Sequence, residues 1–423
     1  MFKFLLKGVF RDRHRWLMPI IVSMAGVSIL VASFSFLGGY QLSYERQTSR
    51  FTSGHLKVVS RAYAEMLDLK PYDLSLLNIE DDLRKWKNMY PQFTWAERIN
   101  FGALIDIPDS LGTTREQGDV VGFAVDLFSD DSEVKRLQLE TSLKSGYLPE
   151  KSGEILLTDL AAEKLEVDVG SEITLIGSTV FGAMSMMNFQ VVGTIEFGIQ
   201  SLDKGAVVAD LNDIREMMDM QNGAGEILLF FPDNEYHHQE AREISHAFNQ
   251  RYSNPDDEFS PKMLTMMEQG NIGYMMSTFD SALLMMALSF ILVLGIVLWN
   301  SGLINSIRRY GEFGLRLAIG ESKRQVYLTL LVEALFTGLV GSILGLLVGS
   351  LGMLYFNIYG LDMSVYNQTG NILTENILYA KFSFQSLMLS FIPGVLSSLL
   401  GASLAGIAIF KRQTSQLFKE LET

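Results

Sequence analysis

Four long apolar runs alternate with polar stretches along the chain, at residues 17–37, 281–303, 328–356 and 387–410. Each is close to the ~20 residues that a helix needs to cross about 30 Å of hydrocarbon. Only the third run contains an ionisable residue, Glu333, near its start. We therefore expect four transmembrane helices, at 17–40, 281–303, 328–356 and 386–410. Burial of these runs in a large soluble core is the less favoured alternative.

The basic residues that flank the runs indicate how the chain is oriented. Lys and Arg gather before the first run, between the second and third, and after the fourth. Because such residues favour the cytoplasmic side, both termini (1–16 and 411–423) and the loop 304–327 are expected in the cytoplasm. Residues 41–280 and the loop 357–385 are expected outside. The first sixteen residues place apolar and basic positions on different helical faces, which suits a helix in the cytoplasmic membrane interface.

The region 41–280 contains shorter apolar runs than the four predicted spans. Brief apolar, β-branched runs bounded by Gly, Pro or Asp predict strands, at 101–107, 120–126, 155–158, 173–176, 189–195, 206–209 and 227–231. Helical patterns lie between them, at 211–220 after Asp210 as a cap, and at 235–251. The predicted fold class is a membrane protein with four transmembrane α-helices and a large extracytoplasmic α+β domain inserted between the first two.

Two methionine-rich stretches in this region are candidate substrate contacts, because flexible Met-rich surfaces bind varied apolar ligands. The first lies between two predicted strands, where polar turn residues are usual; the second, within 263–276, is expected to extend the second membrane helix. The candidate residues are Met184, Met186, Met187 and Phe189 in the first stretch, and Met266, Met267, Met275 and Met276 in the second. For the first stretch, packing into the core is the favoured alternative.

The loop between the second and third runs carries its own pattern. Residues 308–320 predict a short amphipathic helix that ends at Gly320 as a C-cap. Ser322 and Gln325 then have the spacing of a capping box for the next helix. Such a helix either rests on the lipid surface or serves as a contact for a cytoplasmic partner.

Composition narrows the function classes. Hydrophobic residues make up 48% of the chain and charged residues 19%, which is too apolar for an ordinary soluble protein. The net charge of −14 offers no basic footprint for nucleic acid. Without Cys there are no disulfides, thiolate metal sites or Cys nucleophiles. The outer His residues lack metal-ligand or nucleophile-base spacing, so a membrane-anchored enzyme is disfavoured and no catalytic, metal or cofactor-binding residue is assigned.

Three sequence motifs, together with the order of one span, an external domain and three further spans, resemble a known family. They are GEILL at 153–157 followed by LA at 160–161, FQVVGTI at 189–195, and RYGEFGLRLAIG at 309–320. A helix with Glu333 and spaced glycines follows the last motif. The chain resembles the FtsX/MacB/LolC-LolE superfamily of ABC-transporter permeases, most closely its lipoprotein-releasing LolC/LolE branch. The tail lacks the Asp-Pro that often ends this family, so we assign it no docking role.

The resemblance implies a MacB-like external domain and a dimer with a second permease copy or paralogue. It also implies a cytoplasmic ABC ATPase dimer that holds ATP and Mg, since the chain has no GxxxxGK[ST] phosphate loop; this chain itself is expected to bind no cofactor and not to be an enzyme. The implied ATPase-coupling residues are Arg309, Glu312, Phe313, Gly314, Arg316 and Gly320. Residues for packing or gating in the third span are Glu333, Gly338, Gly341 and Gly345, with the glycines expected at the dimer seam. For Glu333, an ion pair with a basic residue of the loop 304–327 is the favoured alternative.

The function that follows is movement of the external domains, driven by ATP hydrolysis in the partner, to extract lipoproteins from the inner (cytoplasmic) membrane. Its partners are then a lipoprotein or another apolar extracytoplasmic substrate and membrane lipid, with no nucleic acid. MacB-like export of drugs, toxins or peptides, and FtsX-like activation of a cell-wall hydrolase, are the alternatives. A sensor or an adhesin is disfavoured, because such a protein would need only a membrane anchor and not four spans with a patterned cytoplasmic loop.

Overall fold

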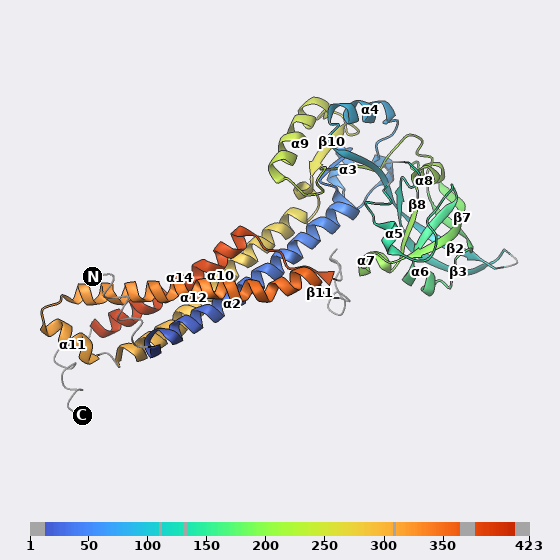
Figure 1. Cartoon of the computed structure of the whole chain (residues 1–423). Coiled ribbons are helices and arrows are strands. Elements are labelled where there is room, and N and C mark those ends of the chain that lie inside the picture. Colours follow the sequence, from blue (N-terminus) through green and yellow to red (C-terminus); the bar gives the residue numbers. More distant parts are fainter. Residues whose placement is uncertain (1–12, 110–111, 130–132, 308–309, 364–376, 411–423) are drawn as a thin grey trace. The chain divides into compact units, whose positions relative to one another are not determined.

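The computed structural model describes residues 13–109, 112–129, 133–307, 310–363 and 377–410 (Figure 1). The amphipathic helix expected within 1–16 and the tail 411–423 therefore lie wholly or mostly outside the described residues. The chain forms two units, and the divisions between them fall near Leu42, Met276 and Leu361. We call them the span unit, which holds most of the long helices, and the α/β unit, which holds residues 43–276, and describe each by itself.

Four long helices build the span unit, and all four are long and apolar enough to cross a membrane. They are α2 (Arg13–Thr48), α10 (Ile272–Ile307), α12 (Lys323–Tyr359) and α14 (Phe384–Phe410), with the short helix α11 (Tyr310–Ala318) between α10 and α12. Each predicted span lies within one of these helices, most of which continue past it. Two short strands, β11 (Leu361–Asp362) and β12 (Ile377–Leu378), pair near the end of α12.

The span helices are joined by apolar packing and by hydroxyl hydrogen bonds. Leu30 and Phe34 of α2 are fully buried in a cluster with Ala287 of α10. Ser28 Oγ of α2 donates to the Gly345 carbonyl of α12 at 3.1 Å. Ser398 Oγ of α14 donates to the Ala334 carbonyl, also on α12, at 3.0 Å. Small polar residues of this kind let helices approach closely in an apolar medium.

A ten-stranded sheet forms the frame of the α/β unit, in the order β10-β1-β9-β2-β3-β8-β5-β7-β4, with β6 pairing both β2 and β7. The strands are β1 (Leu56–Ser60), β2 (Thr94–Pro108), β3 (Thr114–Val125), β4 (Leu143–Gly146), β5 (Glu154–Thr158), β6 (Glu172–Ser178), β7 (Met184–Ile195), β8 (Ala206–Asp210), β9 (Glu226–Phe230) and β10 (Pro261–Thr265). All seven predicted strands overlap strands of this sheet.

Six strands of the sheet close on themselves, because β2, β3, β8, β5, β7 and β6 pair in a ring. We call this ring the barrel. Its core holds alternate residues of the strands, among them Ile105, Leu157, Leu175 and Val191. The helices α6 (Asp159–Lys164) and α8 (Leu211–Met217) contribute to this core. Asp210 caps α8 by accepting from the Asn212 amide, as the sequence predicts.

Three of the four remaining strands, β1, β9 and β10, form a flanking lobe with α4 (Glu80–Met89) and α9 (His238–Tyr252), and the fourth, β4, pairs with β7. Trp86 of α4 and Phe248 of α9 are buried there with ring centroids 5.3 Å apart. The long strand β2 joins the two parts, since its first residues pair with β9 and those from Ile99 onward pair with β3. Residues at this crossing are therefore held by both cores.

Short connecting elements complete the α/β unit. They are a π-helix at Ser49–Ser53, α3 (Arg61–Glu65), α5 (Leu139–Ser142) and α7 (Gln200–Asp203).

One predicted element is wrong in part. Residues 263–271 were expected to be helical, yet the structure places β10 at Pro261–Thr265, a 3-10 turn at Met266–Glu268 and the start of α10 only at Ile272. Thr265 and Glu268 form a capping box around that turn. The apolar residues here face a sheet core, where Met263 is fully buried, so apolar content indicated burial correctly but its period was misjudged.

Candidate functional site

The sequence after the short helix α11 contains both a C-cap that ends this helix and an N-cap that begins α12. Gly320 has φ +105°, and its amide donates to the Leu317 carbonyl at 3.2 Å while the Glu321 amide donates to the Arg316 carbonyl at 3.0 Å. These are the two bonds of a Schellman motif. Ser322 and Gln325 then exchange the two hydrogen bonds of a capping box at the start of α12. The turn between α11 and α12 is thus fixed by local bonds.

The faces of α11 differ in what they contact. Phe313 is only 2% exposed and anchors the helix to the rest of the span unit. Glu312 and Arg316 pair at 3.2 Å, with about a quarter to a third of each side chain exposed. Leu315 and Ile319, one turn apart, are 62% and 76% exposed. Arg309 lies outside the described residues. The helix therefore presents a charged pair and two apolar side chains on its accessible surface.

Gly314 of α11 has open space around it, since a Cβ added there would meet nothing within 4 Å. The glycines of α12 have the opposite setting. A Cβ on Gly338 would lie 2.1 Å from Ser398 Oγ of α14, and one on Gly341 would lie 2.7 Å from Ser23 Cβ of α2. Gly345 is as close to Met24 of α2. These glycines pack against helices of the same chain, whereas we had expected them at a seam with a second copy. Glu333 is half-buried on α12, and its role stays a prediction.

The first methionine-rich stretch is a hairpin instead of a turn between short strands. The strands β6 and β7 pair from Glu172↔Gln190 out to Ser178↔Met184. Because side chains alternate along a strand, Met187 packs on the barrel core and Phe189 is buried in it. Met184 and Met186 point outward and are 77% and 64% exposed. Packing into the core is therefore confirmed for Met187 and Phe189, whereas Met184 and Met186 are exposed and stay candidate substrate contacts.

In the second methionine-rich stretch, Met266 and Met276 are buried, and Met267 and Met275 are half-buried. Little of this stretch is available for contact within the described structure. As candidate substrate contacts, these four residues are weaker than Met184 and Met186.

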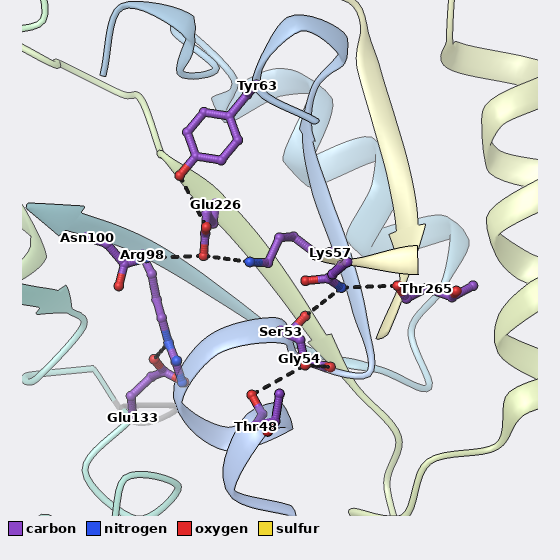
Figure 2. A network of polar contacts seen from close by, with 11 residues as sticks. Thr48, Ser53, Gly54, Lys57, Tyr63, Arg98, Asn100, Glu133, Glu226 and Thr265 are labelled. Atoms are coloured by element: carbon purple, nitrogen blue, oxygen red, sulfur yellow. Dashed lines mark hydrogen bonds and ion pairs between the residues drawn. The ribbon is translucent and has the colours of Figure 1, made fainter. Parts of the chain in front are cut away.

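A buried ion pair links β1 and β9 of the α/β unit, as Figure 2 shows. Lys57 Nζ lies 2.9 Å from Glu226 Oε2, and both side chains are nearly inaccessible. Tyr63 Oη donates to Glu226 Oε1 and Asn100 Nδ2 donates to Oε2, each at 3.1 Å. Burial alone would raise the pKa of Glu226, but the charges of Lys57 and Lys70 and the hydrogen bonds from Lys57 and Tyr63 outweigh it and hold that pKa below its usual range.

A second buried carboxylate lies beside the first pair in Figure 2. Glu133 is held by two hydrogen bonds from Arg98 of β2, one of them Nη2 to Oε1 at 2.9 Å, and by Arg136 Nη1 at 2.6 Å. The two guanidinium groups keep the pKa of Glu133 low in spite of its burial. Arg136 also lies over the ring of Phe230, 4.1 Å from its centroid. Arg98 and Asn100 both stand where β2 passes from one lobe to the other.

Two cavities open in the α/β unit. One of about 900 Å³ has carboxylates in its wall that are already bonded: Glu97 pairs with Arg215 at 2.6 Å, and Asp210 caps α8. The other, of about 520 Å³, we call the basic pocket. Its basic side chains are Arg46, Arg50, Lys135 and Arg136, and His55, Asp233 and Glu235 also line it. In the part of the chain that the structure describes, no three His, Asp or Glu side chains come together as a metal site.

Sequence reasoning did not single out the basic pocket. A signal was present, because Arg46 and Arg50 stand four residues apart within ten residues of the end of the first predicted span. The contribution of Lys135 and Arg136 was not visible, since they lie some 85 residues later and only the fold brings them to the same cavity.

Comparison with known proteins finds one family model that matches part of the chain. Curated proteins give no match. Among solved structures, the chain is similar to the crystal structure of the periplasmic region of MacB from Actinobacillus actinomycetemcomitans, with 8% identity and a TM-score of 0.34 over 51% of this chain and 90% of that one. Residues 284–414, which include most of α10 and all of α11, α12 and α14, match the FtsX-like permease C-terminal family.

Proposed function

We propose that this chain is the permease subunit of an ABC transporter whose ATPase is a separate cytoplasmic subunit. One observation carries the proposal: the FtsX-like permease match covers residues 284–414, and α11, with its accessible charged pair, lies inside that stretch. The chain has no phosphate-binding loop of its own, which supports an ATPase on a partner.

The geometry of α11 supports a role as the contact for that ATPase. Phe313 is buried, the C-terminal end of α11 is fixed by the Schellman motif, and the start of α12 is fixed by the capping box. A push on Leu315, Ile319 or the Glu312–Arg316 pair would therefore reach α12 directly and would not be absorbed by a soft loop. Amphipathic helices that dock in a groove use anchors spaced in this way, at i and i+4.

The packing of the span helices supports transmission of force in place of a channel. Gly341 and Gly345 hold α12 against α2, and Gly338 holds it against α14. Helices in such close contact move together as a rigid body, because packed interfaces are not continuously deformable. In the proposed cycle, ATP-driven closure of the ATPase dimer moves the extracytoplasmic domains. The proposed topology has both termini in the cytoplasm and residues 41–280 outside the inner membrane.

The proposed cargo is a lipoprotein that is extracted from the outer leaflet. Exposed Met184 and Met186, with Phe181 at the tip of the β6–β7 hairpin, give the α/β unit an accessible apolar surface. Apolar side chains of this flexibility suit an apolar cargo or its carrier. The proposed assembly contains a second permease, as a copy of this chain or a paralogue.

The test is purification of the tagged full chain from its own membranes in mild detergent, with identification of co-purifying chains and an ATPase assay. Recovery of a Walker-motif ATPase with hydrolytic activity is the expected result, and acylated proteins in the same complex would support the lipoprotein cargo. A cell-wall hydrolase or a drug-export partner in their place would overturn the cargo but not the coupling. Absence of any ATPase, under conditions that preserve a known ABC complex, would overturn the transporter.

A further inference from the structure

The basic pocket contrasts with the charge of the chain around it. The whole chain carries a net charge of −14, yet four of its basic side chains line one cavity of about 520 Å³. Two of them, Arg46 and Arg50, come from the end of α2 and the π-helix, and the other two, Lys135 and Arg136, precede α5. Segments distant in sequence thus supply positive charge to the same space.

The two acidic side chains of the lining, Asp233 and Glu235, do not cancel this charge, because four basic side chains line the same cavity. Asp233 lies 2.6 Å from His237 Nε2, and its hydrogen bond raises the pKa of His237, so the two groups share their charges with each other. Arg136 shares the single carboxylate of Glu133 with Arg98, which leaves one positive charge in excess. Among the described residues, no acidic side chain forms an ion pair with Arg46 or Lys135.

The chemistry of the lining selects a phosphate group. A guanidinium presents parallel N–H donors that match two phosphate oxygens, and the lysine ammonium adds a point charge. Arg136 is held in place by Glu133 and by the Phe230 ring, so one of the donors is already ordered. A cavity of this size has room for a phosphate together with the small polar group attached to it.

The position of the pocket in the chain indicates where the phosphate comes from. Arg46 and Arg50 follow residue 40, where the first predicted span ends, by six and ten residues. Lys and Arg side chains close to a membrane surface that carries anionic lipids are attracted to the lipid headgroups. We propose that the basic pocket binds the phosphate of an anionic phospholipid headgroup through Arg46, Arg50, Lys135 and Arg136. This site does not depend on ATP hydrolysis or on the identity of the cargo.

The experiment is calorimetric titration of the purified full chain, in neutral detergent and without ATP or ATPase, with dioctanoyl phosphatidylglycerol. Saturable binding is expected, with dioctanoyl phosphatidylcholine binding at least about tenfold more weakly because its choline cancels the phosphate charge. Inorganic phosphate is titrated in parallel. If it binds as tightly as the anionic lipid, the lipid source is overturned.

Two variants with equal loss of charge locate the site. Arg46→Gln/Lys135→Gln removes two exposed pocket cations without touching an ion pair between described residues, and should weaken phosphatidylglycerol binding at least about tenfold. Lys164→Gln/Lys204→Gln removes two exposed cations elsewhere in the α/β unit and should change it by less than about twofold. Unfolding temperatures without lipid confirm that both variants fold. Equal binding by both variants, or no saturable binding by the wild type, would overturn the proposal.

Discussion

Lys57 and Glu226 form a buried ion pair in which each side chain neutralises the charge of the other. Glu226 accepts hydrogen bonds from Tyr63 and Asn100 as well as pairing with Lys57 at 2.9 Å, so every described partner of this carboxylate is inside the protein. A buried pair of this kind adds little compared with an apolar pair, but removing one member strands the other charge. The pair joins β1 to β9, beside the crossing where β2 enters the barrel.

Glu226→Gln should therefore destabilise the α/β unit by about 3–5 kcal/mol, because Lys57 stays buried without a counter-charge. Lys57→Met/Glu226→Gln should recover at least half of that loss. In the double variant the glutamine still accepts from Tyr63, and Asn100 can turn its Oδ1, which has no partner among the described groups, toward the new amide. Unfolding of the full chain followed by tryptophan fluorescence measures both. A double variant as unstable as the single one would show that charge is not the cause.

His55 makes the stability of the α/β unit depend on pH. Its Nδ1 accepts a hydrogen bond from the Phe231 amide at 3.0 Å, and burial lowers its pKa from 6.5 to about 4. Between these values the unfolded chain binds a proton on His55 that the folded chain refuses, so stability is present above pH 6.5 and is lost as the pH falls toward 4. The full effect is on the order of 3 kcal/mol.

His55→Asn tests this account, because Asn Oδ1 can replace Nδ1 as an acceptor for Phe231 but does not titrate. Between pH 7 and pH 4.5 the unfolding temperature of the wild type should fall more steeply than that of the variant. The other titratable groups contribute equally to both proteins, so their effect cancels in the difference between the two unfolding temperatures. Parallel curves would contradict a role for His55.

At the scale of elements, α12 uses its glycines unequally. A Cβ on Gly341 would lie 3.0 Å from the Ile20 carbonyl and closer still to Ser23, whereas one on Gly352 would meet nothing within 4 Å. Both residues stand in the same helix, where Gly341 is buried and Gly352 is exposed. They form a matched pair for testing whether α12 packs within the chain.

Gly341→Ala should lower the stability of the span unit by about 1–3 kcal/mol, the usual cost of overpacking. Gly352→Ala should be neutral or slightly stabilising, since Ala is the better helix former. The midpoint of unfolding in sodium dodecyl sulfate, measured for both full-length variants, gives the comparison. Equal midpoints would place α12 differently from the structure described here.

The elements differ in how far their sequences predict them. The four spans were predictable because hydrocarbon thickness demands a long apolar run, and nothing else in the chain supplies one. Strand β1 was missed because its buried Lys57 interrupts the apolar pattern. The outward Met184 and Met186 hid the length of β7, since an exposed apolar residue breaks the alternation that marks a strand.

The candidate site was predictable only where it is local. Gly320 and the Ser322–Gln325 box could be read from sequence because each acts on residues within one turn of itself. The pair of Arg98 and Glu133 spans 35 positions, and the basic pocket gathers residues from four segments. No local pattern encodes such contacts, because the sheet order of β10-β1-β9-β2 brings them together.

At the scale of the whole molecule, the central claim is that α11 transmits the action of a separate ATPase. The match to FtsX-like permeases covers α11 and most of the helices around it. The claim requires the Glu312–Arg316 pair to meet partner charges, beyond stabilising α11 itself. An exposed helical pair alone contributes only about 0.3–0.5 kcal/mol, so loss of the pair as such would have little effect on folding.

The most direct measurement is ATP hydrolysis by the complex reconstituted in lipid nanodiscs, with Glu312→Arg/Arg316→Glu in α11. The swap keeps an i,i+4 pair within the helix but reverses both charges toward a partner. The control is Glu80→Arg/Arg84→Glu in α4, an exposed pair of the same spacing at 3.0 Å. The account predicts at least about a tenfold loss of permease-dependent hydrolysis for the α11 swap, with normal membrane insertion, and no loss for the α4 swap. Wild-type hydrolysis with the α11 swap would contradict it.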